Sequence, residues 1–131
     1  MKKVTGMALV IIMCVCALSS CAQREKQITV GKASVSEGVY AYFKYTAQKD
    51  NPSASSEEQA EKAKTEILKY VATNSKFSDL SLTLTTAQKN QVSENVNNYW
   101  HLFGTYYTSI GVSKQDLNKV ELNREYKKAI I

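Results

Sequence analysis

One stretch of the sequence limits the fold more than any other: a run of large apolar side chains that recurs every three or four residues. The intervals are 4, 4, 3, 4 and 3, which keeps all six side chains on one face of an α-helix of period 3.6. The six residues are Val92, Val96, Trp100, Phe103, Tyr107 and Ile110. A seam of this length must be covered by other elements, so we expect a long helix packed against further helices.

Capping signals predict where the helices begin and end. Three places have the Ser/Thr-x-x-Glu/Gln/Asp spacing of a capping box, in which the two side chains satisfy free backbone N–H groups at a helix start. They are Ser55 with Glu58, Thr85 with Gln88, and Ser113 with Asp116. Gly111 is suited to end the seam helix, because glycine accepts the positive φ found just after a last turn.

The first helix of the domain is harder to place. Ser34 with Glu37 also has capping-box spacing, and Ser36 is an equally suitable N-cap. Gly38 in the first turn costs about 1 kcal/mol relative to Ala. The apolar face of this helix carries Val39, Tyr42, Phe43 and Thr46, and we expect the helix to run to about Lys49.

Shorter signals complete the domain. Ile28 to Val30 alternates apolar and polar residues and predicts a single short strand. The run 50–54 around Pro52 predicts a loop. A second helix follows, with an expected Glu58–Lys62 ion pair. The apolar stripe of this second helix is Ala60, Ala63, Ile67 and Val71. We expect the helix to fray between Asn74 and Asp79, and residues 80–84 to be extended and half-buried.

The last helix carries Leu117, Val120, Tyr126 and Ile130 on its apolar face. The predicted class is therefore all-α, with about four helices after one short N-terminal strand. Residues 28–131 form this helical domain, and a signal-peptide helix precedes it.

The N-terminal segment has the features of a secretory signal. Lys2 and Lys3 precede fifteen residues without a charge, residues 4–18, which is short of the about 20 needed to span a membrane. The following Leu18-Ser19-Ser20-Cys21 resembles the lipobox of bacterial lipoproteins at all four positions. The resemblance implies cleavage after residue 20 and a diacylglyceryl group on the Cys21 sulfur. The alternative is an ordinary signal peptide with a chance cysteine after it.

The lipobox implies a domain plan and a location. Residues 1–20 are the signal peptide and 21–27 a lipidated tether, and the domain is held at the extracytoplasmic face of a cell membrane. A second acyl group such as palmitate makes anchoring stable, since one chain binds only marginally. Cleavage leaves 111 of the 131 residues and lowers the net charge from +5 to +3. It also removes Cys14 and Cys16, so neither a disulfide nor a free thiolate is expected.

Few residues offer chemistry. His101 is the single histidine and has no second ligand or nucleophile at a suitable spacing, so we expect neither a metal site nor a catalytic residue. The lysines are spread along the chain, and we expect a bilayer surface, not nucleic acid, to face them. The only cofactor expected is the covalent lipid on Cys21.

Aromatic residues give the strongest functional signal. Five of them fall within nine residues, and they cannot all share one side of a helix. They either pack on two sides or form a polypeptide-binding surface, for which Tyr and Trp offer a large contact area with a polar tip. The candidate contacts are Tyr42, Tyr99, Trp100, Phe103, Tyr106 and Tyr107.

Three segments behind the lipobox resemble the N-terminal chaperone domain of SurA/PrsA-type extracytoplasmic foldases. They are ITVGKASVSEGVYAYFKY (28–45), SLTLTTAQKNQVSENV (81–96) and YYTSIGVSKQDLNKV (106–120). The resemblance implies a helical domain that holds unfolded polypeptide. Longer members add a parvulin-type prolyl isomerase domain that has no counterpart before Ile131, so we expect no isomerase activity.

The expected function is therefore chaperone-like binding of unfolded secreted polypeptides by a membrane-anchored lipoprotein that is not an enzyme. Two alternatives stay open: an adaptor lipoprotein that docks one folded partner, and a truncated piece of a peptidyl-prolyl isomerase. A second copy of the chain is a further candidate partner, which would give a homodimer.

Overall fold

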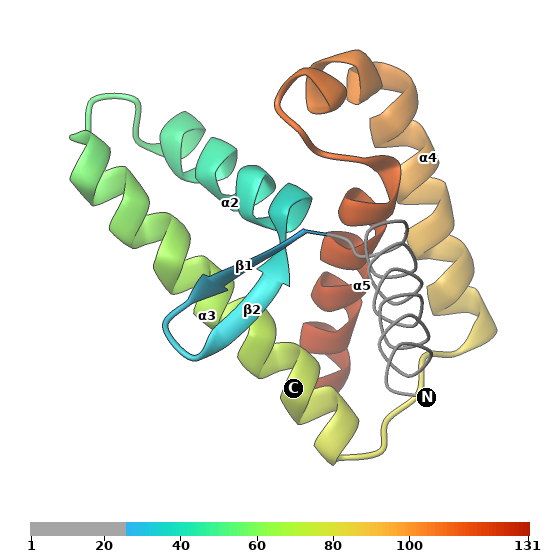
Figure 1. Ribbon diagram of the computed structural model, residues 1–131. Helices are drawn as coiled ribbons and strands as arrows, with labels where there is room; N and C mark the ends of the chain where they lie inside the picture. Colours follow the sequence, from blue (N-terminus) through green and yellow to red (C-terminus); the bar gives the residue numbers. More distant parts are fainter. Residues whose placement is uncertain (1–25) are drawn as a thin grey trace, which may run out of the picture.

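The computed structural model describes residues 26–131, which form a two-stranded hairpin followed by four helices (Figure 1). The elements are β1 (Gln27–Val30), β2 (Ala33–Ser36), α2 (Glu37–Asp50), α3 (Ser56–Asp79), α4 (Thr86–Ser109) and α5 (Lys114–Ile130). The mainly helical class predicted from the sequence is confirmed. The signal peptide, the lipobox and Cys21 lie outside the described residues.

The N-terminal strand is one half of a hairpin, so the prediction of a single strand is wrong. β1 and β2 pair antiparallel, with Ile28 opposite Val35, and the two-residue turn between them begins at Gly31 with φ of 62°. A positive φ at the first central residue suits a two-residue hairpin turn, and glycine adopts it without steric cost. The second strand was missed because it is only four residues long and runs directly into α2.

The start of α2 follows from this hairpin. Ser34 lies within β2, so its predicted capping box with Glu37 is wrong. Ser36 is the N-cap, and its Oγ accepts a hydrogen bond of 3.2 Å from the Val39 backbone N–H. Gly38 lies buried in the first turn against α5, where a Cβ would come within 1.9 Å of an Asp116 carboxylate oxygen. The glycine that weakens the helix locally is therefore required by its packing.

The three predicted capping boxes at the starts of α3, α4 and α5 are all present. Gly111 has φ of 84° after α4, as expected for a helix stop. The ion pair predicted between Glu58 and Lys62 is absent from the described structure, because the Glu58 carboxylate accepts the Ser55 N–H at 2.9 Å and Lys62 pairs with Asp50 instead.

Helix α3 does not fray, contrary to the sequence prediction, because its last turns are packed. Phe77 is buried and stacks on Tyr126 of α5 with ring centroids 4.0 Å apart. Asn123 of α5 donates to the Tyr70 carbonyl at 2.8 Å. The helix ends at Asp79. Leu80, which follows it, is 47% exposed, whereas Leu82 is half-buried and Leu84 is buried, so the predicted half-buried segment is confirmed only at Leu82 and Leu84.

The described helices pack mainly as two pairs, α2 with α3 and α4 with α5. In Figure 1, α2 and α3 lie side by side with the hairpin across them, and α4 packs along α5. Helix α5 contacts both α3 and α4 and so joins the two parts. No helix within residues 26–131 is long and apolar enough to cross a membrane.

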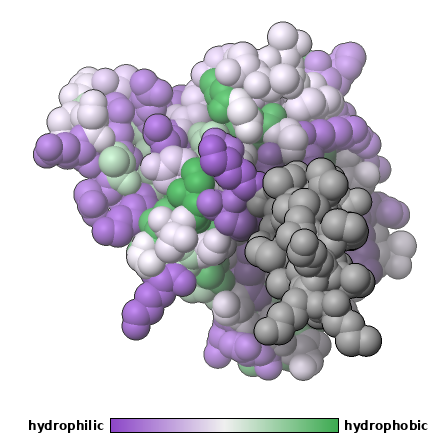
Figure 2. Space-filling view, viewed as in Figure 1, coloured by the Kyte–Doolittle hydropathy of each residue, from purple (hydrophilic) through white to green (hydrophobic). Residues whose placement is uncertain are grey.

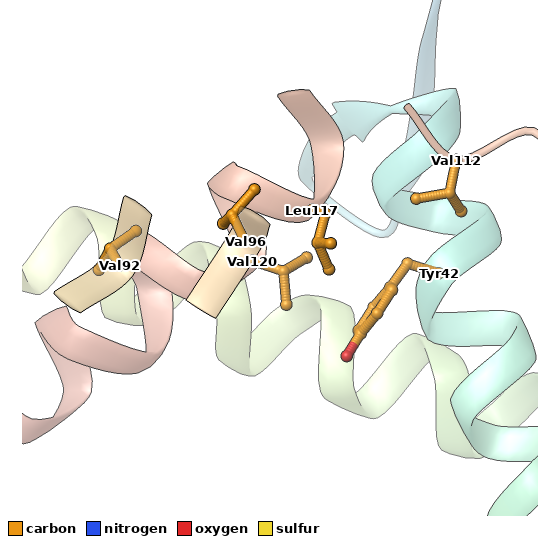
Figure 3. Close-up of a cluster of buried hydrophobic side chains, with 6 residues drawn as sticks. All are labelled: Tyr42, Val92, Val96, Val112, Leu117 and Val120. Carbon is orange, nitrogen blue, oxygen red and sulfur yellow. The ribbon is translucent and has the colours of Figure 1, made fainter. Parts of the chain in front are cut away.

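Two clusters of buried side chains form the core. One joins α2, α4 and α5 (Figure 3) and consists of Tyr42, Val92, Val96, Val112, Leu117 and Val120. The other lies between the hairpin, α2 and α3 and consists of Val30, Val35, Val39, Ile67 and Tyr70. The described residues supply both clusters and all the caps, so they form a folded unit. The face shown in Figure 2 is mainly polar with small apolar patches.

Candidate functional site

A hollow of about 870 Å³ lies where α2, α3, α4 and α5 meet. Its lining residues lie within residues 42–50 of α2, 62–73 of α3, 103–107 of α4 and 120–127 of α5. Seven of the lining residues are aromatic: Tyr42, Phe43, Tyr45, Tyr70, Phe103, Tyr106 and Tyr107.

Some of these rings form a chain of contacts from α3 to α4. The centroids of Tyr70 and Phe43 are 5.6 Å apart, as are those of Phe43 and Tyr42. The chain continues from Tyr42 to Tyr107 at 6.3 Å, and from Tyr107 to the parallel ring of Trp100 at 6.5 Å. These distances fall within the usual range for aromatic pairs, about 4.5–7 Å, so these rings stabilise the helix packing around the hollow.

Tyr42 belongs to the core and also lines the hollow, so it is buried, and its role as a polypeptide contact stays a prediction. It is 6% exposed, and its hydroxyl accepts a hydrogen bond of 2.8 Å from Arg124 Nη2. Burial raises the pKa of the Tyr42 phenol, although the Arg124 guanidinium opposes the rise. The neutral phenol therefore holds α2 against α5 at the edge of the hollow.

The other five candidate contacts divide into two groups. Trp100 and Tyr107 are half-buried against the core cluster. Tyr99, Phe103 and Tyr106 are 39%, 51% and 45% exposed. The exposure of Phe103 contradicts its predicted place in the buried seam.

Phe103 is exposed although it belongs to the predicted apolar seam, because the buried face of α4 changes along the helix. Near the start of the helix the buried residues are Val92 and Val96, whereas near its end the buried position is Gly104. A Cβ on Gly104 would lie 3.0 Å from the Trp100 indole, so the glycine leaves room for that ring along the helix. Packed helices cross at an angle, which shifts the covered face from one end to the other.

This shift leaves an apolar stripe on the outside of α4. Tyr99, Leu102, Phe103 and Tyr106 stand at i, i+3, i+4 and i+7, which places them on one helix face, and Leu102 is 68% exposed. Leu102 was not among the predicted contacts, although its spacing from Tyr99 and Tyr106 places it on their helix face. Phe103 and Tyr106 also line the hollow, and the Tyr106 ring lies 5.1 Å from Tyr45 of α2. We name these four residues the α4 stripe.

The lining of the hollow contains more cationic than anionic side chains. The cations in its lining are Lys49, Lys62, Lys69, Arg124 and Lys127, and the anions are Asp50 and Glu66. Lys62 pairs with Asp50 at 3.7 Å, and Lys69 pairs with Glu66 at 2.9 Å. These cations were not predicted as site residues, because they come from three helices and no local sequence pattern indicates that they line one hollow.

No set of three or more His, Cys, Asp or Glu side chains within residues 26–131 is placed to hold a metal ion. His101 is exposed on α4 and does not line the hollow. The arrangement of apolar rings beside cations is suited to binding a chain with apolar and polar parts.

Comparison with known proteins gives no match: no family model, no curated protein and no solved structure is significantly similar to this chain.

Proposed function

We propose that this protein is a lipid-anchored extracytoplasmic lipoprotein whose helical domain transiently binds unfolded secreted polypeptides. The observation that carries the proposal is the α4 stripe, an exposed apolar surface that is continuous with an aromatic-lined hollow through Phe103 and Tyr106. The resemblance of residues 28–131 to the N-terminal domain of SurA/PrsA-type foldases supports the same function.

The chemistry of the stripe fits a binder of many sequences. Hydrophobic contact has no preferred direction and scales with the apolar area removed from water. Contiguous exposed apolar surface on a small domain usually marks an interaction site. Tyr99 and Tyr106 add hydroxyl groups that hydrogen-bond to the backbone of a bound chain whatever its sequence.

The size of the hollow favours an extended segment over a folded partner. Its volume of about 870 Å³ lies within the range of ligand sites, about 300–1,000 Å³. A short piece of chain fits into such a space, whereas a folded domain does not. Binding in this proposal is holding without chemistry, so prolyl isomerisation is not part of it.

The test is an aggregation assay with the soluble domain, residues 22–131. At near-stoichiometric ratios it should slow the aggregation of an unrelated denatured protein. Tyr99→Ser with Leu102→Ser should weaken this protection. The matched control is Leu68→Ser with Leu80→Ser, because these residues are 41% and 47% exposed but lie on α3 and at its end. Circular dichroism should show unchanged helicity in both variants.

Other outcomes would point to the alternatives. No protection together with tight binding to one folded protein would favour the adaptor. Faster refolding of a substrate limited by prolyl isomerisation would contradict the non-enzymatic proposal.

A further inference from the structure

The charged side chains around the hollow are unevenly matched. Its two anions are both paired across or along the helices, Asp50 with Lys62 and Glu66 with Lys69. Lys49 and Lys127 also line the hollow, and neither forms an ion pair with any carboxylate of residues 26–131. The hollow therefore presents two exposed ammonium groups without a counter-charge from the described part of the chain.

The other cation that α5 contributes to the hollow already has partners within the domain. Arg124 forms an ion pair with Glu121 through Nη1 and donates to the Tyr42 hydroxyl through Nη2. It lies one helical turn before Lys127, so its positive charge adds to the potential at that end of the hollow. Glu121 is itself buried, and it does not line the hollow.

The position of Lys49 and of Lys127 in its own helix is explained by local helix chemistry, but the presence of both in one hollow is not. Lys49 is in the last turn of α2 and Lys127 in the last turn of α5, where the helix dipole favours a cation. Either lysine would be equally favoured there if its helix faced solvent on all sides. The fold brings both to one hollow that is also lined by Phe103, Tyr106 and Tyr107.

We propose that the hollow selects polypeptide segments in which acidic side chains stand next to apolar ones. The carboxylates would pair with Lys49 and Lys127, while the apolar side chains would contact the aromatic lining. This inference rests on the proposed function and names the class of segment that the site prefers. The lysines stand in the lining of a concave site, which an extended chain can enter and a bilayer surface cannot.

The experiment compares three labelled peptides of equal length that contain the same Phe and Leu residues and differ in carrying Glu, Gln or Lys between them. Fluorescence anisotropy with residues 22–131 measures each dissociation constant. Exposed ion pairs are individually weak, so we expect the Glu peptide to bind roughly 2- to 30-fold tighter than the Gln peptide, and the Lys peptide to bind weakest. The preference should shrink as salt rises from about 0.05 to 0.5 M.

The variant Lys49→Gln with Lys127→Gln should remove most of this preference, so that the ratio of the Gln-peptide to the Glu-peptide dissociation constant falls towards one. The control is Lys32→Gln with Lys89→Gln, which makes the same change of charge at exposed positions outside the hollow. It should keep most of the preference. An equal loss in both variants would overturn the inference, because it would mean that overall charge, not the hollow, attracts the peptide.

Failure of the inference is distinguishable from failure of the proposed function. Equal binding of all three peptides would overturn the preference and leave polypeptide binding intact. No binding of any peptide would overturn both.

Sedimentation with vesicles of neutral or anionic lipid tests the remaining source of negative charge, which is the membrane surface. If Lys49→Gln with Lys127→Gln weakened only binding to anionic vesicles, the hollow cations would serve the membrane and the inference would be wrong.

Discussion

The hydroxyl of Ser36 donates a hydrogen bond of 2.8 Å to the carboxylate of Asp116, a residue 80 positions further along the chain. Ser36 is the N-cap of α2, and the same carboxylate accepts the backbone N–H and the hydroxyl of Ser113, the N-cap of α5, at 2.9 and 2.6 Å. One buried carboxylate therefore fixes the starts of two helices relative to each other, and both of those helices line the hollow.

The first prediction concerns acid stability. Burial alone would raise the pKa of Asp116, but the hydrogen bonds from Ser113 and Ser36 and the nearby Lys119 ammonium outweigh it and lower the pKa below its usual value. A lowered pKa in the folded state means that the carboxylate stabilises the fold above the unfolded pKa, about 3.9. This stability should be complete above about pH 5 and be lost as the pH falls through the lower folded value.

The measurement is the urea midpoint between pH 7 and pH 2.5 for the natural chain and for Asp116→Asn. The variant should be less stable at pH 7 by about 1–3 kcal/mol, because an amide cannot accept all of these hydrogen bonds. It should also lose less stability on acidification. Parallel pH profiles for the two proteins would contradict the role assigned to Asp116.

The second prediction is that Gly38→Ala destabilises the domain even though Ala favours helices by about 1 kcal/mol. The new Cβ would lie 1.9 Å from an Asp116 oxygen, and that carboxylate cannot move without breaking its hydrogen bonds. Overpacking of this kind typically costs about 1–3 kcal/mol. Chemical denaturation of Gly38→Ala, Asp116→Ala and the double variant should show strong non-additivity, because Asp116→Ala removes the clash.

The third prediction contrasts two neighbours in the predicted seam of α4. Trp100→Ala should cost about 1–3 kcal/mol, below the about 3–5 kcal/mol of a fully buried aromatic, because the ring is half-buried and stacked on Tyr107. Phe103→Ala should cost less than about 1 kcal/mol, since Phe103 is 51% exposed. Denaturant midpoints measure both, and a loss of about 1–3 kcal/mol for Phe103→Ala, as large as that expected for Trp100→Ala, would mean that Phe103 is also in the core.

The fourth prediction tests the anchor. Cys21→Ser should leave the protein uncleaved or released from the membrane, because the lipid needs the cysteine sulfur as its acceptor. Membrane fractionation and the mass of the product distinguish the natural chain from the variant. A Cys21→Ser protein that is still processed and tightly bound would show that the Leu18-Ser19-Ser20-Cys21 segment is not a functional lipobox.

Local chemistry made part of the fold readable from the sequence. The N-caps Ser55, Thr85 and Ser113 were predicted correctly, because a capping box needs only two side chains and the backbone between them. Gly111 was predicted for the same reason, since a positive φ is a property of one residue. Tyr99 and Tyr106 are aromatic residues outside the periodic seam, and both are exposed.

Tertiary packing decided the rest. Ser36, not Ser34, caps α2 because the chain from Ala33 pairs with β1 before the helix begins. Helix α3 stays intact to Asp79 because Phe77 packs on a residue 49 positions away. Phe103 is exposed, although it belongs to the same periodic seam as Val96, because periodicity fixes which residues share a face but not the angle at which a second helix crosses it.

The candidate site likewise has a part that the sequence predicts and a part that depends on tertiary packing. The sequence by itself determined that α4 would carry more aromatic side chains than one buried face can hold. It did not determine that Lys49 and Lys127, which stand 78 residues apart, would line the same hollow. Their place in one hollow depends on the packing of α5 against both α3 and α4. Such long-range packing is set by the complementary shapes of whole helix faces, which no local stretch of sequence contains.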